Sequence, residues 1–295
     1  MNLKDLYKYT FCEEPSRDFC SGLNPRLYPF FLKRIYRYRT GERLNLDNPK
    51  TFSEKIQWLK LNDSTKVKSD LTDKVKVREY VKEKIGPDYL KNVYDVWDNF
   101  EDIDFQKLPD IFVLKTNHSC GTNTFIKKED LTANNIKALA LKYKDWIESN
   151  FSFAAGFEMH YTNIERKIFA EEFIPNIQEY QVMCFNGSPK YICVYYATSN
   201  GLHTSWYDTD IKLQPFNLKS NTELKTAQIN ENVAKHILNL SEKLATNFPL
   251  VRCDFNLSNN RILFEEMTFT PTSGFKLFTP DKYERKLGDL LTLKQ

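Results

Sequence analysis

The stretch VRCDFNLSNNRILFEEMTFTPTSGF, residues 251–275, decides how this chain folds. Its first half alternates strictly between apolar and polar residues, which predicts a β-strand with one face in the core. The other face presents three polar side chains: Arg252, Asp254 and Asn256. A turn at residues 258–260 then reverses the chain, so the stretch is predicted to be a β-hairpin.

The second strand of this hairpin, residues 262–269, carries Glu265 and Glu266 in an otherwise apolar run. Carboxylates in such a place are costly unless they are paired or bind a metal ion. One carboxylate on each of two neighbouring strands can hold Mg²⁺ and leave positions open for phosphate oxygens. The alternative is an ordinary hairpin whose acidic side chains form a surface ion pair.

The register of the hairpin decides which glutamate lies beside Asp254. A two-residue turn at 259–260 would set Asp254 opposite Glu265. A three-residue turn that includes Arg261 would set it opposite Glu266. The alternation of residues leaves both registers open.

The composition is that of a globular chain. Its 295 residues are 41% hydrophobic and 27% charged, which suffices for a large core and more than one lobe. No apolar run approaches the roughly 18 residues of a membrane span, and the N-terminus lacks an apolar signal core, so a cytoplasmic location is expected. A formal net charge of +3 argues against a dedicated nucleic-acid-binding protein. The six cysteines include no CxxC pair, which argues against a zinc site or a disulfide framework.

Residues 1–90 are predicted to form a helical N-terminal region. Basic and aromatic residues are mixed between positions 26 and 43, a pattern that could meet a membrane surface or an acidic polymer. A packed helix with a solvated basic face gives the same pattern. Residues 51–54 form a capping box, and apolar spacing over 72–85 predicts a further helix that carries Lys74.

From about residue 93 the pattern changes to strands. A buried strand at 111–115 ends in Lys115 and is followed by the polar loop TNHSCGTN, residues 116–123, and a second strand. Backbone N–H groups of such a loop can bind phosphate, and the lysine supplies positive charge. The loop has one glycine and no following helix, so it is not a Walker loop, and an ordinary hairpin is the alternative.

Three more patterns lie in the second half of the chain. A strand at 167–174 contains Glu171 and Glu172, which could bond an exocyclic amine or mark a strand end that emerges into solvent. Asn186-Gly187 is a strong hairpin signal. The triplet Asp208-Thr209-Asp210 could bind a metal ion and a nucleotide-sugar diphosphate, but the flanking strand-like residues favour a turn.

Taken in order, these segments resemble an ATP-grasp protein, and in detail the chain is similar to the TupA-like (teichuronopeptide biosynthesis) ATP-grasp family of bacterial surface-polysaccharide genes. The segments that carry the similarity are NPKTFSEKIQWLKLND (48–63), DKVKVREYVKEKIG (73–86), FVLKTNHSCG (112–121), AEEFI (170–174), CFNG (184–187) and FEEMTFTPTSGF (264–275). The resemblance implies an α+β ATP-grasp fold in which two α/β lobes clamp ATP, preceded by a reduced, largely helical N-terminal region. It implies three parts: residues 1–90, a small lobe at 91–170 with the phosphate-binding hairpin, and a large lobe at 171–295 with the adenine and Mg²⁺ sites.

The resemblance also implies a role for each matching residue. The ATP phosphates would be bound by Lys74, Lys115, His118, Ser119, Gly121 and Thr122. The nucleoside would be held by Glu171 at the adenine amino group, by Glu172 and Ile174 through their backbone, and by Glu179 at the ribose. Mg²⁺ would be held by Asp254, Glu266 and Thr268. Lys115 and Arg252 would act in catalysis, with Arg252 stabilising the transferred phosphoryl group or the tetrahedral intermediate.

Several positions depart from the family pattern. Thr268 stands where many ATP-grasp ligases have an asparagine metal ligand, and Thr272 stands where glycine is expected. Gln181 replaces a common lysine, and Thr204 stands where a basic residue is frequent. These changes concern the substrate contacts and the second metal position.

The resemblance also selects a register for the hairpin. Aligning the Glu-x-Thr segment before the proline puts Glu266 beside Asp254. This alignment predicts a longer turn through Arg261 and leaves Glu265 on the other face of the strand.

The implied activity is that of an ATP-dependent carboxylate-amine ligase, with ATP and Mg²⁺ as cofactors. ATP would convert a carboxylate to an acyl phosphate, and an amine would displace phosphate to give an amide. The implied partners are a carboxylate-bearing sugar or polysaccharide precursor and an amine or amino acid, with no nucleic acid. The alternatives are a glycosyltransferase that uses Asp208 and Asp210, a kinase acting on a sugar hydroxyl, and a non-catalytic nucleotide- or glycan-binding protein.

Overall fold

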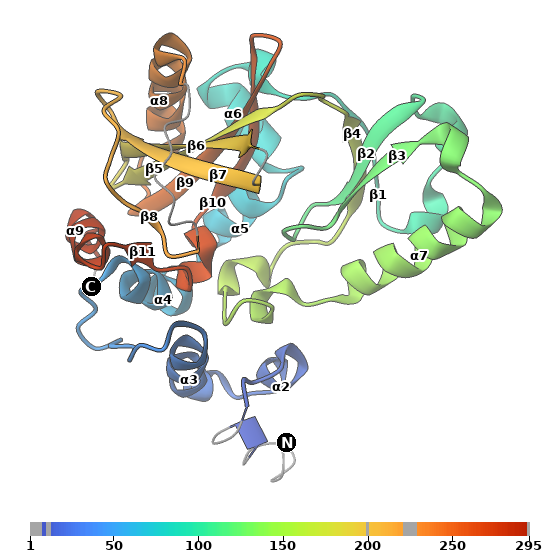
Figure 1. The fold of residues 1–295 in the computed structure, drawn as a ribbon. Coiled ribbons are helices and arrows are strands. Elements are labelled where there is room, and N and C mark those ends of the chain that lie inside the picture. The colour runs from blue at the N-terminus through green and yellow to red at the C-terminus, as the bar shows by residue number, and fades with distance from the viewer. Residues whose placement is uncertain (1–7, 10–12, 199–200, 221–228, 294–295) are drawn as a thin grey trace.

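A computed structural model describes residues 8–9, 13–198, 201–220 and 229–293. Two antiparallel sheets lie side by side, with the N-terminal helices below them (Figure 1). The four-stranded sheet has the order β1-β4-β2-β3, with bounds Val93–Trp97 (β1), Ile111–Thr116 (β2), Asn123–Lys127 (β3) and Ile168–Glu172 (β4). The five-stranded sheet has the order β10-β9-β5-β6-β7, with bounds Gln178–Phe185 (β5), Ser188–Thr198 (β6), Gly201–Asp208 (β7), Leu250–Ser258 (β9) and Arg261–Thr268 (β10).

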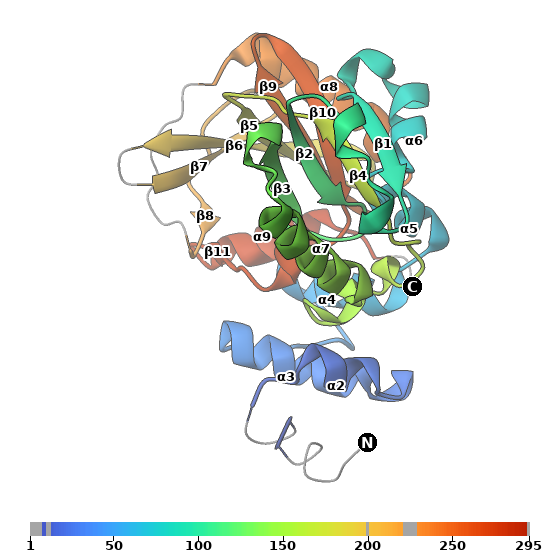
Figure 2. The ribbon, with the colours of Figure 1, turned by 90° about the vertical axis from the view of Figure 1, so that its right-hand side faces the viewer.

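Helices cover the outer faces of both sheets and fill the base of the molecule. Their bounds are Arg17–Ser21 (α2), Tyr28–Thr40 (α3), Phe52–Asn62 (α4), Lys66–Thr72 (α5), Val77–Lys84 (α6), Ala133–Glu148 (α7), Glu231–Ala245 (α8) and Lys282–Leu290 (α9). A two-stranded ribbon of Asn217–Leu218 (β8) and Phe278–Thr279 (β11) lies near α9. In Figure 2 the four-stranded sheet faces the viewer, with strands β9 and β10 behind it. Across the described ranges, no helix combines the length and the apolar character that a membrane crossing requires.

The helical N-terminal region forms as the sequence predicts, with one correction. Helix α4 begins at the predicted capping box, because the Thr51 hydroxyl accepts the Glu54 backbone N–H and the Glu54 carboxylate accepts that of Thr51. The helix predicted over 72–85 does not begin at Thr72. The chain bends at Asp73, whose carboxylate accepts the backbone N–H groups of residues 75 and 76, so Lys74 lies in the turn between α5 and α6.

The basic segment at 26–43 forms helix α3 with a solvated face. Its apolar side chains pack in a core with Phe153 and Phe157. Arg39 pairs with Glu14 at 2.5 Å, and Arg37 is exposed. This arrangement agrees with the packed-helix alternative, and contact with a membrane or a polymer stays a prediction.

The four-stranded sheet places Lys115 and Glu171 on the same face. Val113 pairs with Glu171, so Lys115 and Glu171 are diagonal neighbours on strands β2 and β4. The opposite face carries Phe112 and Leu114, which pack in a core with side chains of α7. The alternation of the strand therefore points the charged side chains away from α7 and toward the other sheet.

The five-stranded sheet has the same two-sided character. Val251, Cys253 and Phe255 of β9 pack in a core with Ile237 and Leu240 of α8. Alternation then directs the polar side chains of β9 toward the four-stranded sheet, as predicted. Asn186 and Gly187, both at positive φ, join β5 to β6 as the predicted hairpin.

The hairpin of β9 and β10 corrects the sequence-based prediction. Glu266 pairs with Asp254 as the resemblance implies, but not through a longer turn. The turn is the two-residue one at Asn259 and Asn260, both at positive φ. A β-bulge at Glu265 shifts the register by one residue.

Candidate active site

A cavity of about 470 Å³ lies between the two sheets. It is lined by all of the predicted site residues except His118 and Thr268, namely Lys74, Lys115, Ser119, Gly121, Thr122, Glu171, Glu172, Ile174, Glu179, Arg252, Asp254 and Glu266. Strands β2 and β4 supply the lining from one lobe, and strands β5, β9 and β10 supply it from the other. A single site thus collects side chains from both sheets.

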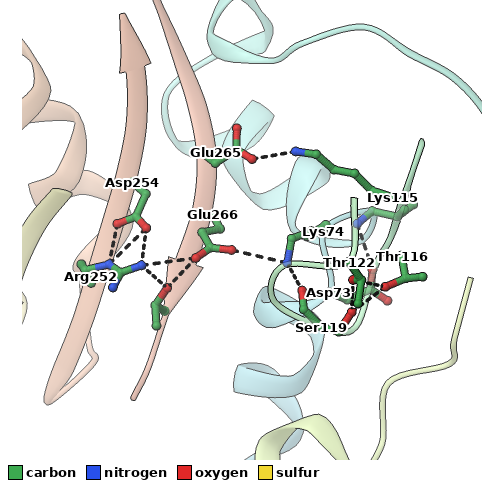
Figure 3. A network of polar contacts seen from close by, with 12 residues as sticks. Asp73, Lys74, Lys115, Thr116, Ser119, Thr122, Arg252, Asp254, Glu265 and Glu266 are labelled. Atoms are coloured by element: carbon green, nitrogen blue, oxygen red, sulfur yellow. Dashed lines mark hydrogen bonds and ion pairs between the residues drawn. The ribbon is translucent and has the colours of Figure 1, made fainter. Parts of the chain in front are cut away.

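The predicted phosphate loop between β2 and β3 is held by a cluster of hydroxyls and by Lys74. The Thr116 hydroxyl bonds those of Ser119 at 2.5 Å and Thr122 at 2.6 Å. Lys74 Nζ donates to the Ser119 carbonyl at 2.7 Å and lies 3.4 Å from Glu266 Oε2 (Figure 3). Lys74 therefore links the loop to the acid on β10.

His118 does not join the site. Its imidazole is buried beneath α7, with Nε2 3.2 Å from the Trp146 carbonyl oxygen. Burial, with Arg166 adding to it, lowers the pKa of His118 to about 4, so the ring is neutral near pH 7. The residue anchors the loop to the small lobe and does not line the cavity.

Two lysines and two glutamates form an alternating ionic square inside the cavity. Lys115 Nζ lies 2.6 Å from Glu171 Oε1 and 2.7 Å from Glu265 Oε1. Lys91 Nζ lies 3.0 Å from Glu171 Oε1 and also bonds Glu265 Oε2. Burial by itself would raise the pKa of Glu265. Lys91 and Lys115 outweigh this effect and lower the pKa to about 2. Glu265 is therefore ionised near pH 7, and each of the two glutamates is paired with both lysines.

Arg252 is the centre of a second cluster. Its Nε donates to Asp254 Oδ1 at 2.7 Å, and its terminal nitrogen donates to Glu266 Oε1 at 3.3 Å and to the Thr268 hydroxyl at 3.2 Å (Figure 3). Burial raises the pKa of the Asp254 carboxyl to about 7, although Arg252 acts in the opposite direction. Oxygen atoms of three side chains thus converge on one cation, and Thr268 belongs to the cluster although it does not line the cavity.

The same oxygen atoms suit Mg²⁺. Within the described ranges, no group of three or more His, Cys, Asp or Glu side chains is arranged to hold a metal ion by itself. Asp254 and Glu266 face each other across the hairpin register, with the Thr268 hydroxyl 3.1 Å from Glu266 Oε1. Mg²⁺ is commonly held by one or two carboxylates together with substrate phosphates. The donor set therefore fits a Mg²⁺ ion that enters with a nucleotide.

The other end of the cavity combines polar and apolar side chains. In the part of the chain that the structure describes, both lysine contacts of Glu171 use one oxygen, Oε1, so its Oε2 remains for another donor. Phe173, Ile174 and Ile177 supply apolar surface beside it. Glu179 Oε1 accepts from Gln181 Nε2 at 2.6 Å, and burial raises the pKa of the Glu179 carboxyl. These features suit a planar base and a ribose.

Sequence reasoning missed Lys91 and the orientation of Glu265. Lys91 precedes β1 outside any motif, and its only signal is one lysine in an otherwise unremarkable segment. Glu265 was predicted to point to the other face, but the bulge turns both Glu265 and Glu266 into the cavity. Asn256, which donates to Glu265 Oε2 at 2.8 Å, completes the set.

The triplet at 208–210 lies outside the cavity. Asp208 Oδ1 accepts the backbone N–H groups of Asp210 and Lys212 at 3.0 and 2.9 Å. Its Oδ2 accepts from Gln214 Nε2 at 2.9 Å. Asp208 thus caps a turn, as the flanking strands predict, and its oxygens are engaged within that turn.

A family comparison accounts for this arrangement. The sequence model described as TupA-like ATPgrasp matches residues 54–292. The chain belongs to the TupA-like ATP-grasp family. The α+β architecture, with two lobes around one cavity behind a helical N-terminal region, is accordingly the predicted ATP-grasp fold. Helices α2 and α3 precede the matched region of this TupA-like protein.

Solved structures give more distant similarities. D-alanine–D-alanine ligase from Bacillus anthracis complexed with ATP is 14% identical, with a TM-score of 0.44 over 75% of this chain and 64% of that one. The ligase from Coxiella burnetii is 18% identical, with a TM-score of 0.43 over 81% and 62%. The ATP-grasp ligase PsnB complexed with minimal precursor, Mg and ADP is 9% identical, with a TM-score of 0.41 over 88% and 66%. The TupA-like chain thus spans less than two thirds of these proteins. Among proteins with curated descriptions, none matches.

Proposed function

We propose that this TupA-like ATP-grasp protein is an ATP-dependent ligase that joins a carboxylate to an amine. The observation that carries the proposal is one cavity in which Lys74, Lys115 and Arg252 lie beside the acids Asp254 and Glu266. Cations for phosphate and carboxylates for Mg²⁺ are the groups that ATP-driven activation of a carboxylate requires.

The proposed reaction has two steps. An oxygen of the substrate carboxylate attacks the γ-phosphorus of ATP, and ADP leaves. The amine then attacks the acyl carbon, and phosphate leaves with the bonding electrons and takes up the proton that the amine loses as the amide forms. Both steps gather negative charge, which Lys74, Lys115 and Arg252 offset in a cavity that limits water. Mg²⁺ held by Asp254 and Glu266 would supply further charge neutralisation.

The predicted nucleotide contacts other than His118 have a place in this scheme. Lys74, Lys115 and the loop residues Ser119, Gly121 and Thr122 bind the phosphates. Glu171 bonds the adenine amino group through Oε2, the backbone of Glu172 and Ile174 bonds the ring, and Glu179 holds the ribose. Arg252 donates to the transferred phosphoryl group or to the tetrahedral intermediate.

The proposed substrates are inferred from the occurrence of the family among bacterial surface-polysaccharide genes. The carboxylate is that of a uronic acid in a bacterial surface-polysaccharide precursor, and the amine belongs to an amino acid or amino sugar. The reaction takes place in the cytoplasm, where ATP is supplied, and the basic face of α3 allows peripheral contact with a membrane.

An assay of ADP release tests the proposal. The protein is incubated with Mg·ATP and with pairs of uronic acids and amines, and hydroxylamine is added in parallel to trap an acyl phosphate as its hydroxamate. The ligase proposal expects ADP release that depends on a carboxylate, and a hydroxamate product. It is wrong if no acid among the uronic acids, amino acids and their nucleotide-linked forms stimulates ADP release or yields a hydroxamate.

Matched variants separate this proposal from its alternatives. Glu266→Gln removes a cavity carboxylate and should abolish turnover, whereas Asp210→Asn removes an exposed carboxylate outside the cavity and should not. A glycosyltransferase that uses Asp208 and Asp210 would show the reverse. A kinase would transfer phosphate to a sugar without amide formation, and a binding protein would bind Mg·ATP without ADP release.

A further inference from the structure

The ionic square offers a role for Lys91 and Glu265 that the proposed function does not assign. Lys91 and Lys115 each contact both Glu171 and Glu265, so positive and negative groups alternate around the square. Three of the four residues are less than one tenth exposed in the cavity wall: Lys91, Lys115 and Glu171. Such an arrangement fixes the position of each member through two partners.

The square joins the two lobes. Lys91, Lys115 and Glu171 come from the segment before β1, from β2 and from β4, and together they carry one net positive charge. Glu265 comes from β10 of the other sheet and neutralises it. The bulge at Glu265 brings its carboxylate into the cavity, and Asn256 on β9 supports it at 2.8 Å.

Lys115 and Glu171 keep hydrogen-bonding groups that a nucleotide could use. A lysine ammonium has three N–H donors. Lys115 donates one to Glu265 Oε1 and lies 2.6 Å from Glu171 Oε1, so these two contacts leave at least one N–H for a ligand. Both lysines lie beside Oε1 of Glu171, so among the described residues these contacts leave Oε2 for a ligand. All four side chains line the same cavity.

We propose that Lys91 and Glu265 set the charge around the two groups that meet the nucleotide: Lys91 offsets one of the two carboxylates paired with Lys115, and Glu265 offsets the net positive charge of Lys91, Lys115 and Glu171. In this arrangement an N–H of Lys115 faces a phosphate and Oε2 of Glu171 faces the adenine amino group. The inference rests on the proposed ATP-binding function. Lys91 and Glu265 touch neither phosphate nor base, and act through Lys115 and Glu171.

The charges of the two residues predict effects of opposite sign. Lys91→Met leaves two carboxylates on one lysine, so a net negative charge faces the phosphates, and binding of Mg·ATP should weaken by about tenfold or more. Glu265→Gln leaves one net positive charge, and binding should strengthen by about threefold or more. The double variant restores neutrality and should bind within about threefold of the wild type.

Calorimetric titration of the full chain with Mg·ATP tests these signs. Lys91→Arg keeps the charge and should bind close to the wild type, which separates electrostatic positioning from loss of packing. Lys137→Met, an exposed lysine of α7 outside the cavity, controls for the change in net charge and should bind as the wild type does. Thermal unfolding of each variant identifies any that fails to fold.

The outcomes separate the inference from the function on which it rests. If the wild type binds Mg·ATP and Lys91→Met binds it with the same affinity, the inference is wrong but the proposed function stands. Weaker binding in Glu265→Gln, with an additive loss in the double variant, also overturns it, because a purely structural square predicts that result. A wild type that binds no Mg·ATP overturns the proposed function and the inference together.

Discussion

Arg252 is placed by the alternation of β9, which puts it on the same face as Asp254. Its guanidinium then reaches Asp254, Glu266 and Thr268 at once. A planar fork of N–H groups can serve several oxygen acceptors in fixed directions, whereas a lysine ammonium is a compact charge. The geometry of the cluster therefore depends on arginine and not only on a positive charge.

Arg252→Lys should lower kcat by roughly 10²-fold or more, because it keeps the charge but loses the fixed donors for the charge that develops in the reaction. Steady-state ADP release measures this change. Arg285→Lys makes the same replacement on the exposed face of α9, at a pair with Asp289, and should retain the wild-type kcat. A wild-type kcat in Arg252→Lys would show that charge alone suffices.

The turn Pro271–Gly274, directly after β10, holds strained backbone. Thr272, Ser273 and Gly274 have φ values of 54°, 51° and 63°, all in the left-handed region. Gln57 of α4 donates to the carbonyl oxygens of Ser273 at 3.0 Å and Gly274 at 2.9 Å. Because left-handed residues other than glycine cost about 1–2 kcal/mol each, packing against α4 must hold this turn in place.

Gly274→Ala should reduce the free energy of unfolding by about 3 kcal/mol. The added Cβ would lie 2.5 Å from Gln57 Nε2 and 2.8 Å from Ile56 Cγ2, in addition to the strain of positive φ. Gly41→Ala is the matched control, since Gly41 has a φ of 77° and, apart from its chain neighbours, no heavy atom of the described residues lies within 4 Å of the added carbon. Urea denaturation should give only about 1 kcal/mol for the control. Equal losses would mean that packing against α4 contributes nothing.

Thr272→Gly should raise the free energy of unfolding by up to about 1 kcal/mol. Relief of the left-handed strain contributes about 1–2 kcal/mol, and the added freedom of glycine in the unfolded chain offsets part of it. Ser273→Gly should gain less, because burial raises the pKa of the Glu158 carboxyl and the Ser273 side chain is among the groups that oppose this effect. Urea denaturation compares the two, and a loss of stability in Thr272→Gly would contradict the strain argument.

At the scale of the whole molecule, two buried histidines couple its stability to pH. Burial, with Arg166 adding to it, lowers the pKa of His118 to about 4. Burial, with Lys68 adding to it, lowers the pKa of His160 to about 3. Both rings bind a proton more readily in the unfolded chain, whose histidine pKa is about 6.5. Their contribution to stability is therefore present above pH 6.5 and is lost as the pH falls through the folded values.

The two histidines should accordingly lower the free energy of unfolding between pH 6.5 and 4, at up to about 1.4 kcal/mol per pH unit each, while the raised pKa of Asp254 acts in the opposite direction over the same range. His160→Gln should show a shallower dependence than the wild type, even if it is less stable at pH 7. Urea denaturation at pH 5, 6 and 7 measures the slope. An unchanged slope would show that His160 does not titrate on unfolding.

Local patterns predicted much of this architecture and several of the residues that line the cavity. The capping box at Thr51, the Asn186-Gly187 hairpin and the alternation of β9 each depend on residues that are close in sequence. Similarity to the family then indicated the residues of the cavity. The boundaries at 90 and 170 between the three predicted parts stay predictions.

The sequence by itself determined the strands, the turns and which faces are polar, because backbone propensity and burial act over a few neighbouring residues. Tertiary structure alone decided that Glu265 and Lys91 line the cavity and that His118 lies outside it. The Lys91–Glu265 and Lys115–Glu265 contacts join residues 174 and 150 positions apart, and one β-bulge decides them. No local period encodes such contacts, because they depend on how two separately formed sheets come together.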